Sequence, residues 1–117
     1  MKKAWVELNI FSGRPDPGWE IPLEQAMELY KEALSFPATD AKKLFEGLGY
    51  RGFMVFIDQN DEQRIICTVF SDLVKIVNGS TIQYKRDKER KMEKWLLRSA
   101  KTNIDEPLFK VIEKQIL

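Results

Sequence analysis

The segment 53–86 constrains the fold most, because its strand-like runs are joined by turns too short for any crossover connection. The runs FMVFI and RIICTVF flank the polar turn DQNDEQ, and the run LVKIV ends in Asn78-Gly79, a strong hairpin-turn signal. Strands joined this closely pair antiparallel, since a parallel pair needs a crossover of about a dozen residues or more. The segment predicts one hairpin, followed by either a second, more exposed hairpin or a strand with a bulge.

Strand and helix patterns flank this segment. Residues 4–11 alternate between an apolar face and a mixed face, which predicts another strand. Apolar residues at helical spacing predict a helix over 22–35 and a short helix over 39–49. Asp87 and Asp105 are placed to cap two further helices near the carboxyl end. The apolar residues that we expect on the inner faces of these two helices are Met92, Trp95, Leu96, Leu108, Val111, Ile112 and Ile116.

This order of elements predicts an α+β fold: a mostly antiparallel sheet of four to five strands, with helices packed mainly on one face. A chain of 117 residues with no repeat and no linker fits a single domain spanning 1–117. The single cysteine allows no internal disulfide, and the initial lysines precede no apolar signal core. No apolar run approaches the ~20 residues of a membrane span. We therefore expect a cytoplasmic protein with no membrane partner.

The absence of histidine is the most informative feature of the composition. The chain lacks the usual general base near neutral pH and the imidazole ligands of most catalytic zinc and iron sites. It cannot build a Ser-His or Cys-His nucleophile. A net charge of +1 also disfavours nucleic acid as a partner, because such binding needs a clear basic excess. We expect no metal site and no cofactor, and the question of enzymatic activity stays open.

Three other groups of chemically active residues are interpreted as structural. Cys67 shares a strand face with apolar neighbours, so a buried, inert thiol is expected. The acidic turn at 58–62 lacks the ligand pattern of a calcium loop and is typical of a solvated turn. The basic residues between 85 and 94 alternate with acidic ones, which is typical of an exposed helix face with local ion pairs.

The second face of the predicted sheet is unusually apolar. If Phe53, Val55 and Ile57 face the helices, the residues on the other face of the hairpin are Met54, Phe56, Ile66 and Phe70. A face of this composition is rarely left in water. Our first expectation is that the carboxy-terminal helices cover it. The alternative is that it binds a protein partner or a second copy of the chain.

The loop IFSGRPDPGW, residues 10–19, combines two glycines with two prolines that bracket an aspartate. The prolines stiffen the loop, so less conformational entropy is lost when the side chains of the loop bind a ligand. The loop displays Arg14, Asp16 and Trp19, with Glu20 next to it. Arg14 has the geometry to hold a carboxylate or phosphate through two hydrogen bonds. In the structural alternative, Arg14 pairs with Glu20 or Asp16, and Trp19 fills an edge of the core.

The motifs ELNIFSGRPDPGW and LGYRGF together resemble two motifs shared by small uncharacterised bacterial proteins. In that group an asparagine commonly stands in the place of Asp16. The resemblance covers about the first half of the chain. Because the group has no known activity, the resemblance implies no catalytic residue; it implies only that the Arg14 loop and the Tyr50-Arg51 segment occur together.

The position of the two motifs predicts that they meet. The loop follows the first strand, and LGYRGF precedes the first strand of the hairpin. If those strands are antiparallel, Arg14, Tyr50 and Arg51 lie at one end of the sheet and border a common concavity, beside Asp16, Trp19 and Glu20.

Two functions fit these observations. The leading hypothesis is a small, non-catalytic accessory or interaction module that uses the apolar face Met54, Phe56, Ile66 and Phe70. The alternative is a binder of a small anionic ligand, or a histidine-free enzyme, that uses Arg14, Arg51, Tyr50 and a carboxylate such as Glu7 or Glu20. An enzyme of this kind needs a carboxyl pKa raised by burial, or a tyrosine pKa lowered by neighbouring arginines.

Overall fold

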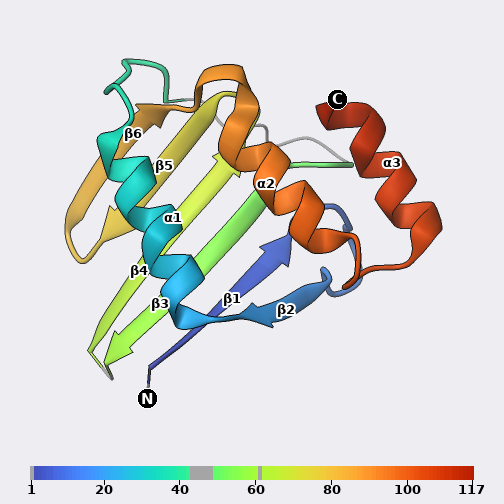
Figure 1. The fold of residues 1–117 in the computed structure, drawn as a ribbon, viewed down its shortest axis with the longest axis horizontal. Helices are drawn as coiled ribbons and strands as arrows, with labels where there is room; N and C mark the ends of the chain where they lie inside the picture. The colour runs from blue at the N-terminus through green and yellow to red at the C-terminus, as the bar shows by residue number, and fades with distance from the viewer. Residues whose placement is uncertain (1, 43–48, 61) are drawn as a thin grey trace.

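The computed structural model of the protein describes residues 2–42, 49–60 and 62–117. Six strands and three α-helices follow one another in the order β1, β2, α1, β3, β4, β5, β6, α2, α3, with a short 3₁₀ turn at Lys88–Arg90 before α2 (Figure 1). The strands are β1 (Lys3–Leu8), β2 (Gly18–Ile21), β3 (Phe53–Asn60), β4 (Gln63–Phe70), β5 (Leu73–Asn78) and β6 (Thr81–Arg86). The helices are α1 (Leu23–Ser35), α2 (Lys91–Ala100) and α3 (Glu106–Ile116).

The strands form one antiparallel sheet in the order β2-β1-β3-β4-β5-β6. The predicted α+β class and antiparallel pairing are confirmed, but the sheet has six strands rather than four to five. The missing strand is β2, which pairs Trp19 with Val6 at the sheet edge. It is only four residues long, so it is too short to show an alternating pattern, and its first two residues, Gly18 and Trp19, belong to the loop that the sequence predicts.

Both predicted hairpins are present. β3 and β4 flank the turn of the first hairpin, and β5 and β6 pair around Asn78-Gly79, where Gly79 has a φ of 61°. That positive φ is accessible to glycine without strain, which explains the residue at this turn. The alternative of a strand with a bulge in the second run is therefore excluded.

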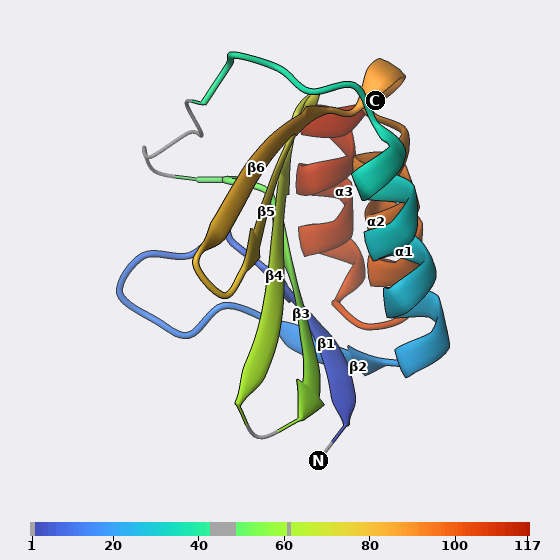
Figure 2. The ribbon, with the colours of Figure 1, turned by 90° about the vertical axis from the view of Figure 1, so that its left-hand side faces the viewer.

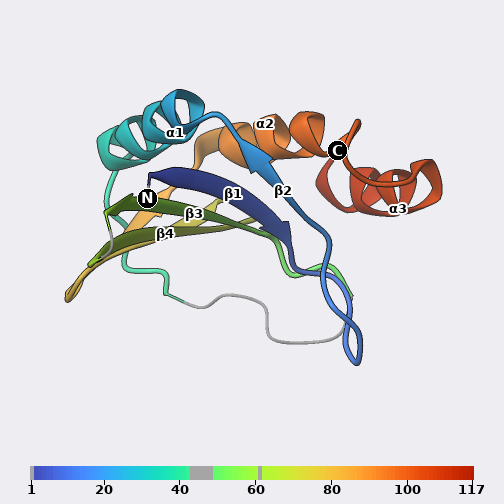
Figure 3. The same cartoon turned by 90° about the horizontal axis from the view of Figure 1, so that it is seen from below.

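The three helices lie on the same side of the sheet (Figure 2). The core between the helices and the sheet contains Val6, Phe53 and Val55 from the strands, together with Ala26 from α1 and Leu96 from α2. The carboxy-terminal helices therefore do not cover the face that carries Phe56, contrary to our first expectation. They pack on the face opposite to it, because α2 directly follows β6 and turns back over the side that α1 occupies (Figure 3).

The ends of the helices agree closely with the sequence patterns. α1 ends at Ser35 as predicted, with Pro22 at its N-cap rather than inside its first turn. The Asp105 side chain accepts the Leu108 N–H at the start of α3, as expected of a capping residue. One inner-face prediction is wrong: the side chain of Val111 is exposed. The predicted short helix over 39–49 falls mostly on residues 43–48, which lie outside the described residues.

Within the described residues, none of the helices is both long enough and apolar enough to cross a membrane.

Candidate functional site

The two sequence motifs meet through the backbone. Strands β1 and β3 are antiparallel, and their ladder continues past the end of β1: Asn9 N–H donates to the Gly52 carbonyl, and Arg51 N–H donates to the Asn9 carbonyl. Gly52 has a φ of 99°, and a Cβ atom built there would lie 2.3 Å from the Val69 carbonyl oxygen. Only glycine fits this position, so the second glycine of LGYRGF is explained by close backbone packing.

Asp16 holds the opening loop in shape. Its Oδ1 atom accepts hydrogen bonds from the backbone N–H groups of Ile10 and Phe11, at 3.0 and 2.7 Å. The guanidinium of Arg51 donates to the Phe11 carbonyl at 2.9 Å, and that of Arg14 lies 3.7 Å from the centre of the Phe11 ring. The part of the prediction that places Arg14 and Arg51 at one end of the sheet is thus confirmed, with Phe11 as their shared neighbour. That the two side chains border a common concavity stays a prediction.

The remaining residues of the predicted ligand set lie apart from this pair. Trp19 is buried on β2, as the structural alternative expected, whereas Glu20 is exposed on the same strand. Tyr50 turns away from the loop and reaches α2 on the helical side of the sheet. The proposed ligand-binding role of this set stays a prediction, and the geometry accounts for Asp16, Arg51 and Trp19 as parts of the scaffold.

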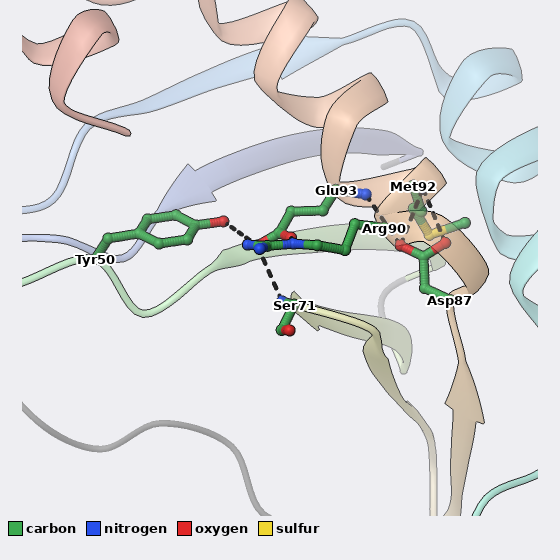
Figure 4. Close-up of polar contacts among 6 residues, drawn as sticks. All are labelled: Tyr50, Ser71, Asp87, Arg90, Met92 and Glu93. Atoms are coloured by element: carbon green, nitrogen blue, oxygen red, sulfur yellow. Dashed lines mark hydrogen bonds and ion pairs between the residues drawn. The ribbon is translucent and has the colours of Figure 1, made fainter. Parts of the chain in front are cut away.

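Tyr50 ends in a polar cluster centred on Glu93, in the first turn of α2 (Figure 4). The Glu93 carboxyl is fully buried. Its Oε2 atom accepts hydrogen bonds from the Tyr50 hydroxyl at 2.6 Å and from the Ser71 N–H at 3.0 Å, and its Oε1 atom accepts one from Nε of Arg90. These contacts join the segment before β3, the β4–β5 turn and the start of α2. Donors therefore compensate both oxygens of a carboxylate that water does not reach.

Asp87 adds a second buried carboxylate next to this cluster. The backbone N–H of Met92 is shared between the two carboxyl oxygens of Asp87, each at 3.0 Å. The backbone N–H of Glu93 donates to Oδ2 at 3.2 Å. Asp87 thus satisfies amides in the first turn of α2, as a cap does, but the N-cap position of α2 is Arg90 and not Asp87 as predicted, because the 3₁₀ turn at Lys88–Arg90 lies between them. Desolvation raises the pKa of the Asp87 carboxyl, and the backbone N–H donors partly oppose that rise.

The backbone around Glu93 is strained. Among the described residues, the non-glycine positions with positive φ are Ser71 (57°), Glu89 (59°) and Arg90 (56°). Two of these residues donate to Glu93, and Glu89 lies directly before Arg90. A left-handed backbone costs a non-glycine residue about 1–2 kcal/mol. Strain of this kind persists only where the surrounding contacts hold it, and it concentrates at functional sites and clamps.

Burial fixes the protonation state of Tyr50. Desolvation raises the pKa of its hydroxyl far above the ordinary value, and the nearby Glu93 carboxylate raises it further, while Arg90 acts in the opposite direction. This is the reverse of the lowered tyrosine pKa that the enzyme hypothesis required. The hydroxyl stays a hydrogen-bond donor at neutral pH, so Tyr50 serves the cluster as a donor and not as a general base.

A pocket of about 270 Å³ opens beside the cluster. Its lining includes Tyr50, Phe70, Ser71, Arg90 and Gln115. The side chain of Arg90 is 29% exposed there, whereas Glu93 beneath it is not exposed. Phe70 packs against the Tyr50 ring at 5.7 Å between ring centres and against the core. Phe70 therefore lines this pocket, and the alternation along β4 keeps it on the same side of the strand as Ile66, as predicted.

The sheet face opposite the helices carries a row of apolar side chains that crosses five strands in register. The row, which we call the apolar row, consists of Trp5, Phe56, Ile66, Val77 and Ile82. The rings of Trp5 and Phe56 stack at 5.0 Å, and the guanidinium of Arg64 lies over both rings while it pairs with Asp58. Ile82, at the far end, is 55% exposed.

The sequence also singled out Cys67 and the acidic turn at 58–62. Cys67 is buried, and desolvation raises the pKa of its thiol to about 12, so it has no thiolate near neutral pH. Asp58, expected in a solvated turn, pairs instead with Arg64 across the hairpin, and this hydrogen bond lowers the pKa of its carboxyl. Asp61 of the same turn lies outside the described residues. No group of three potential metal-ligating residues occurs among the described ones.

Sequence patterns did not single out Glu93. It lies in a run of alternating charges, and such a run is typical of a solvated helix face. One signal was available: Glu93 adjoins Met92 and lies three residues from Leu96, so it belongs to the edge of the inward helix face. The Tyr50 hydroxyl that donates to Glu93 belongs to a residue 43 positions away in the sequence, so no local pattern indicates this contact.

Comparisons of the chain with protein-family models, with curated proteins and with solved structures find no match.

Proposed function

We propose that this protein is a non-catalytic interaction module that binds a second copy of itself through the sheet face opposite the helices. The observation that carries the proposal is the apolar row, which crosses five strands on a face that no described helix covers (Figure 3). In an antiparallel sheet with one solvated face, that face is normally polar. A continuous apolar row there is the pattern of a surface that is buried on association.

The charges that flank the row favour a second copy as the partner. Lys3 and Glu7 lie on either side of Trp5 on the same face of β1. A two-fold axis along the row would place Lys3 of one copy opposite Glu7 of the other, and the reverse pair would form at the same time. Such a self-complementary arrangement is what an isologous interface requires. The aliphatic residues Ile66, Val77 and Ile82 would then meet their own counterparts across the axis.

The size of the face sets the expected strength of association. Six strands at a spacing of about 4.8 Å and a strand length of about 20 Å make a face of about 500 Å² per copy. Two such faces bury about 1,000 Å² in total, which is at the lower limit for a specific interface. The proposal therefore predicts a weak dimer, with a dissociation constant in the micromolar range.

Analytical ultracentrifugation over about 1 µM to 1 mM tests this proposal. The expected result for the wild type is a monomer–dimer equilibrium within that range. Val77→Lys places a charge in the middle of the row and should leave only monomer, because a lysine facing its own counterpart in the dimer adds desolvation and repulsion.

Val111→Lys is the matched control. It introduces the same residue in place of a valine that is 53% exposed on α3, on the helical side of the molecule, and it should dimerise like the wild type. A wild type that stays monomeric up to about 1 mM contradicts the second copy as partner. Equal dimerisation of the two variants contradicts the apolar row as the interface.

A further inference from the structure

We propose that the pocket lined by Tyr50, Phe70, Ser71, Arg90 and Gln115 binds a small carboxylate that has an aromatic body. This site lies on a different part of the molecule from the apolar row and does not depend on the dimer. It also differs from the Arg14 and Arg51 set that the sequence suggested. The proposal rests on the position of the Arg90 guanidinium, on the aromatic walls and on the strained backbone that holds both in place.

Only part of the hydrogen-bonding capacity of the Arg90 guanidinium is used by contacts among the described residues. Its Nε atom donates to Oε1 of Glu93, and this contact fixes the orientation of the planar group. Within the described residues, its two terminal Nη groups donate no hydrogen bond, and the side chain is partly exposed at the pocket. These Nη groups form the end-on fork that a carboxylate accepts through two parallel hydrogen bonds.

The Glu93 carboxylate does not close the site to an anion. Its Oε2 atom is already compensated by the Tyr50 hydroxyl and the Ser71 N–H, and its Oε1 atom by Arg90. The Oε1 atom of Glu93 accepts from Nε of the guanidinium, and the ligand carboxylate would accept from the terminal Nη groups. Figure 4 shows Arg90 and Glu93 side by side, with Tyr50 at one end of the pair. The ligand carboxylate is thus closer to the cation than to the buried anion.

The walls of the pocket select the body of the ligand. The rings of Tyr50 and Phe70 lie at 43° to each other, with centres 5.7 Å apart, and they offer apolar surface beside the fork. A planar ring packs against such surfaces, while the amide of Gln115 supplies a polar group at the rim. A volume of about 270 Å³ suits a single-ring carboxylate.

The left-handed backbone at Arg90 and Ser71 gives the site its pre-organisation. Both residues line the pocket and have positive φ, Ser71 in the two-residue turn between β4 and β5, and both donate a hydrogen bond to Glu93, Arg90 through its side-chain Nε and Ser71 through its backbone N–H. An unstrained backbone at position 90 would direct the guanidinium elsewhere. The protein therefore maintains two strained residues at the position where the unused donors face a pocket, which is the expected arrangement in a ligand clamp.

An NMR titration of the ¹⁵N-labelled protein with benzoate tests the proposal. The expected result is saturable shifts at the backbone amides of Tyr50, Ser71, Arg90 and Gln115, with a dissociation constant below about 1 mM. Benzyl alcohol, which has the ring without the carboxylate, should produce at least tenfold weaker binding. Absence of saturable shifts at these amides up to about 10 mM benzoate, or equal binding of benzyl alcohol, overturns the proposal without any variant.

Arg90→Lys and Arg98→Gln separate the fork from general charge. Arg90→Lys keeps a cation beside Glu93 but lacks the two Nη donors, so the benzoate affinity should fall at least tenfold while the amide spectrum stays dispersed. Arg98→Gln removes an exposed arginine from α2, the helix that directly follows Arg90, and should bind benzoate like the wild type. Unchanged affinity in Arg90→Lys, or an equal loss in Arg98→Gln, would show that the binding does not use the fork.

Discussion

Removing the Tyr50 hydroxyl isolates the contribution of one hydrogen bond to a buried carboxylate. Tyr50→Phe keeps the ring, which packs against Phe53 and Phe70, and deletes only the donor that lies 2.6 Å from Oε2 of Glu93. That oxygen then retains the Ser71 N–H at 3.0 Å as its remaining donor. A hydrogen bond to a charged group contributes about 1.5–3 kcal/mol, and the Glu93 carboxylate that accepts this one is fully buried. We expect a loss of about 2 kcal/mol in the free energy of unfolding.

The assay is urea denaturation of the wild type and variant, supported by calorimetry. The unfolding entropy of a chain of 117 residues is about 0.25 kcal/mol/K, so a loss of 2 kcal/mol lowers Tm by about 8 °C. Tyr84→Phe is the matched control, because the Tyr84 hydroxyl forms no hydrogen bond within the described residues, and it should change stability by less than about 0.5 kcal/mol.

A double-mutant cycle with Glu93→Gln completes the test. If the hydroxyl acts through the carboxylate, the two substitutions should be coupled by at least about 1 kcal/mol. A loss below about 0.5 kcal/mol in Tyr50→Phe, or additive effects of the two changes, would refute the argument that Glu93 depends on Tyr50.

Two further predictions concern Asp16 and Cys67. Because Oδ1 of Asp16 accepts two backbone N–H groups, Asp16→Ala should lower the free energy of unfolding by about 1–2 kcal/mol. Asp16→Asn keeps an Oδ1 acceptor and should lower it by less than half as much. Equal losses for the two variants in urea denaturation would contradict this role of Asp16. The Cys67 thiol has a pKa of about 12 in the fold and about 8.5 when unfolded, so its contribution to stability is complete below pH 8.5 and is lost as the pH rises toward 12. The destabilisation caused by Cys67→Ala should therefore shrink by about 2–3 kcal/mol between pH 8 and pH 10.5, and a constant difference between the two proteins would show that the thiol ionises in the fold.

The local sequence was sufficient for most of the secondary structure. The hairpins follow from short polar turns, and α1 and α3 follow from helical spacing bounded by proline or capping residues. Each of these signals acts over a few residues, so it does not depend on the rest of the fold. β2 is the exception, because four residues at a sheet edge become a strand only when β1 is present to pair with them.

The meeting of the two motifs was also predictable, because it depends on strand direction alone. Antiparallel pairing of β1 and β3 brings the end of one strand to the start of the other, so Arg14 and Arg51 reach the same end of the sheet. Their side-chain partners were not predictable. Whether an arginine faces a pocket or donates to a carbonyl is decided by neighbours that lie about 40 residues away.

What the sequence by itself determined is which residues share a face within each strand of the first hairpin: Phe53, Val55 and Ile57 on one side, and Phe56 and Ile66 of the apolar row on the other. Those assignments follow from alternation within each strand and from short connections between strands. The cross-strand register that joins Trp5, Val77 and Ile82 to the row came from the tertiary structure. Only the tertiary structure decided which face the helices cover, because both faces of the hairpin are apolar and local patterns do not distinguish them. It also decided the state of Glu93: the same helix position is solvated or buried depending on whether Tyr50 and Ser71 arrive to supply donors. The burial of a side chain and the supply of its hydrogen-bond donors depend on residues that are distant in the sequence, so they cannot be predicted from a local stretch of the chain.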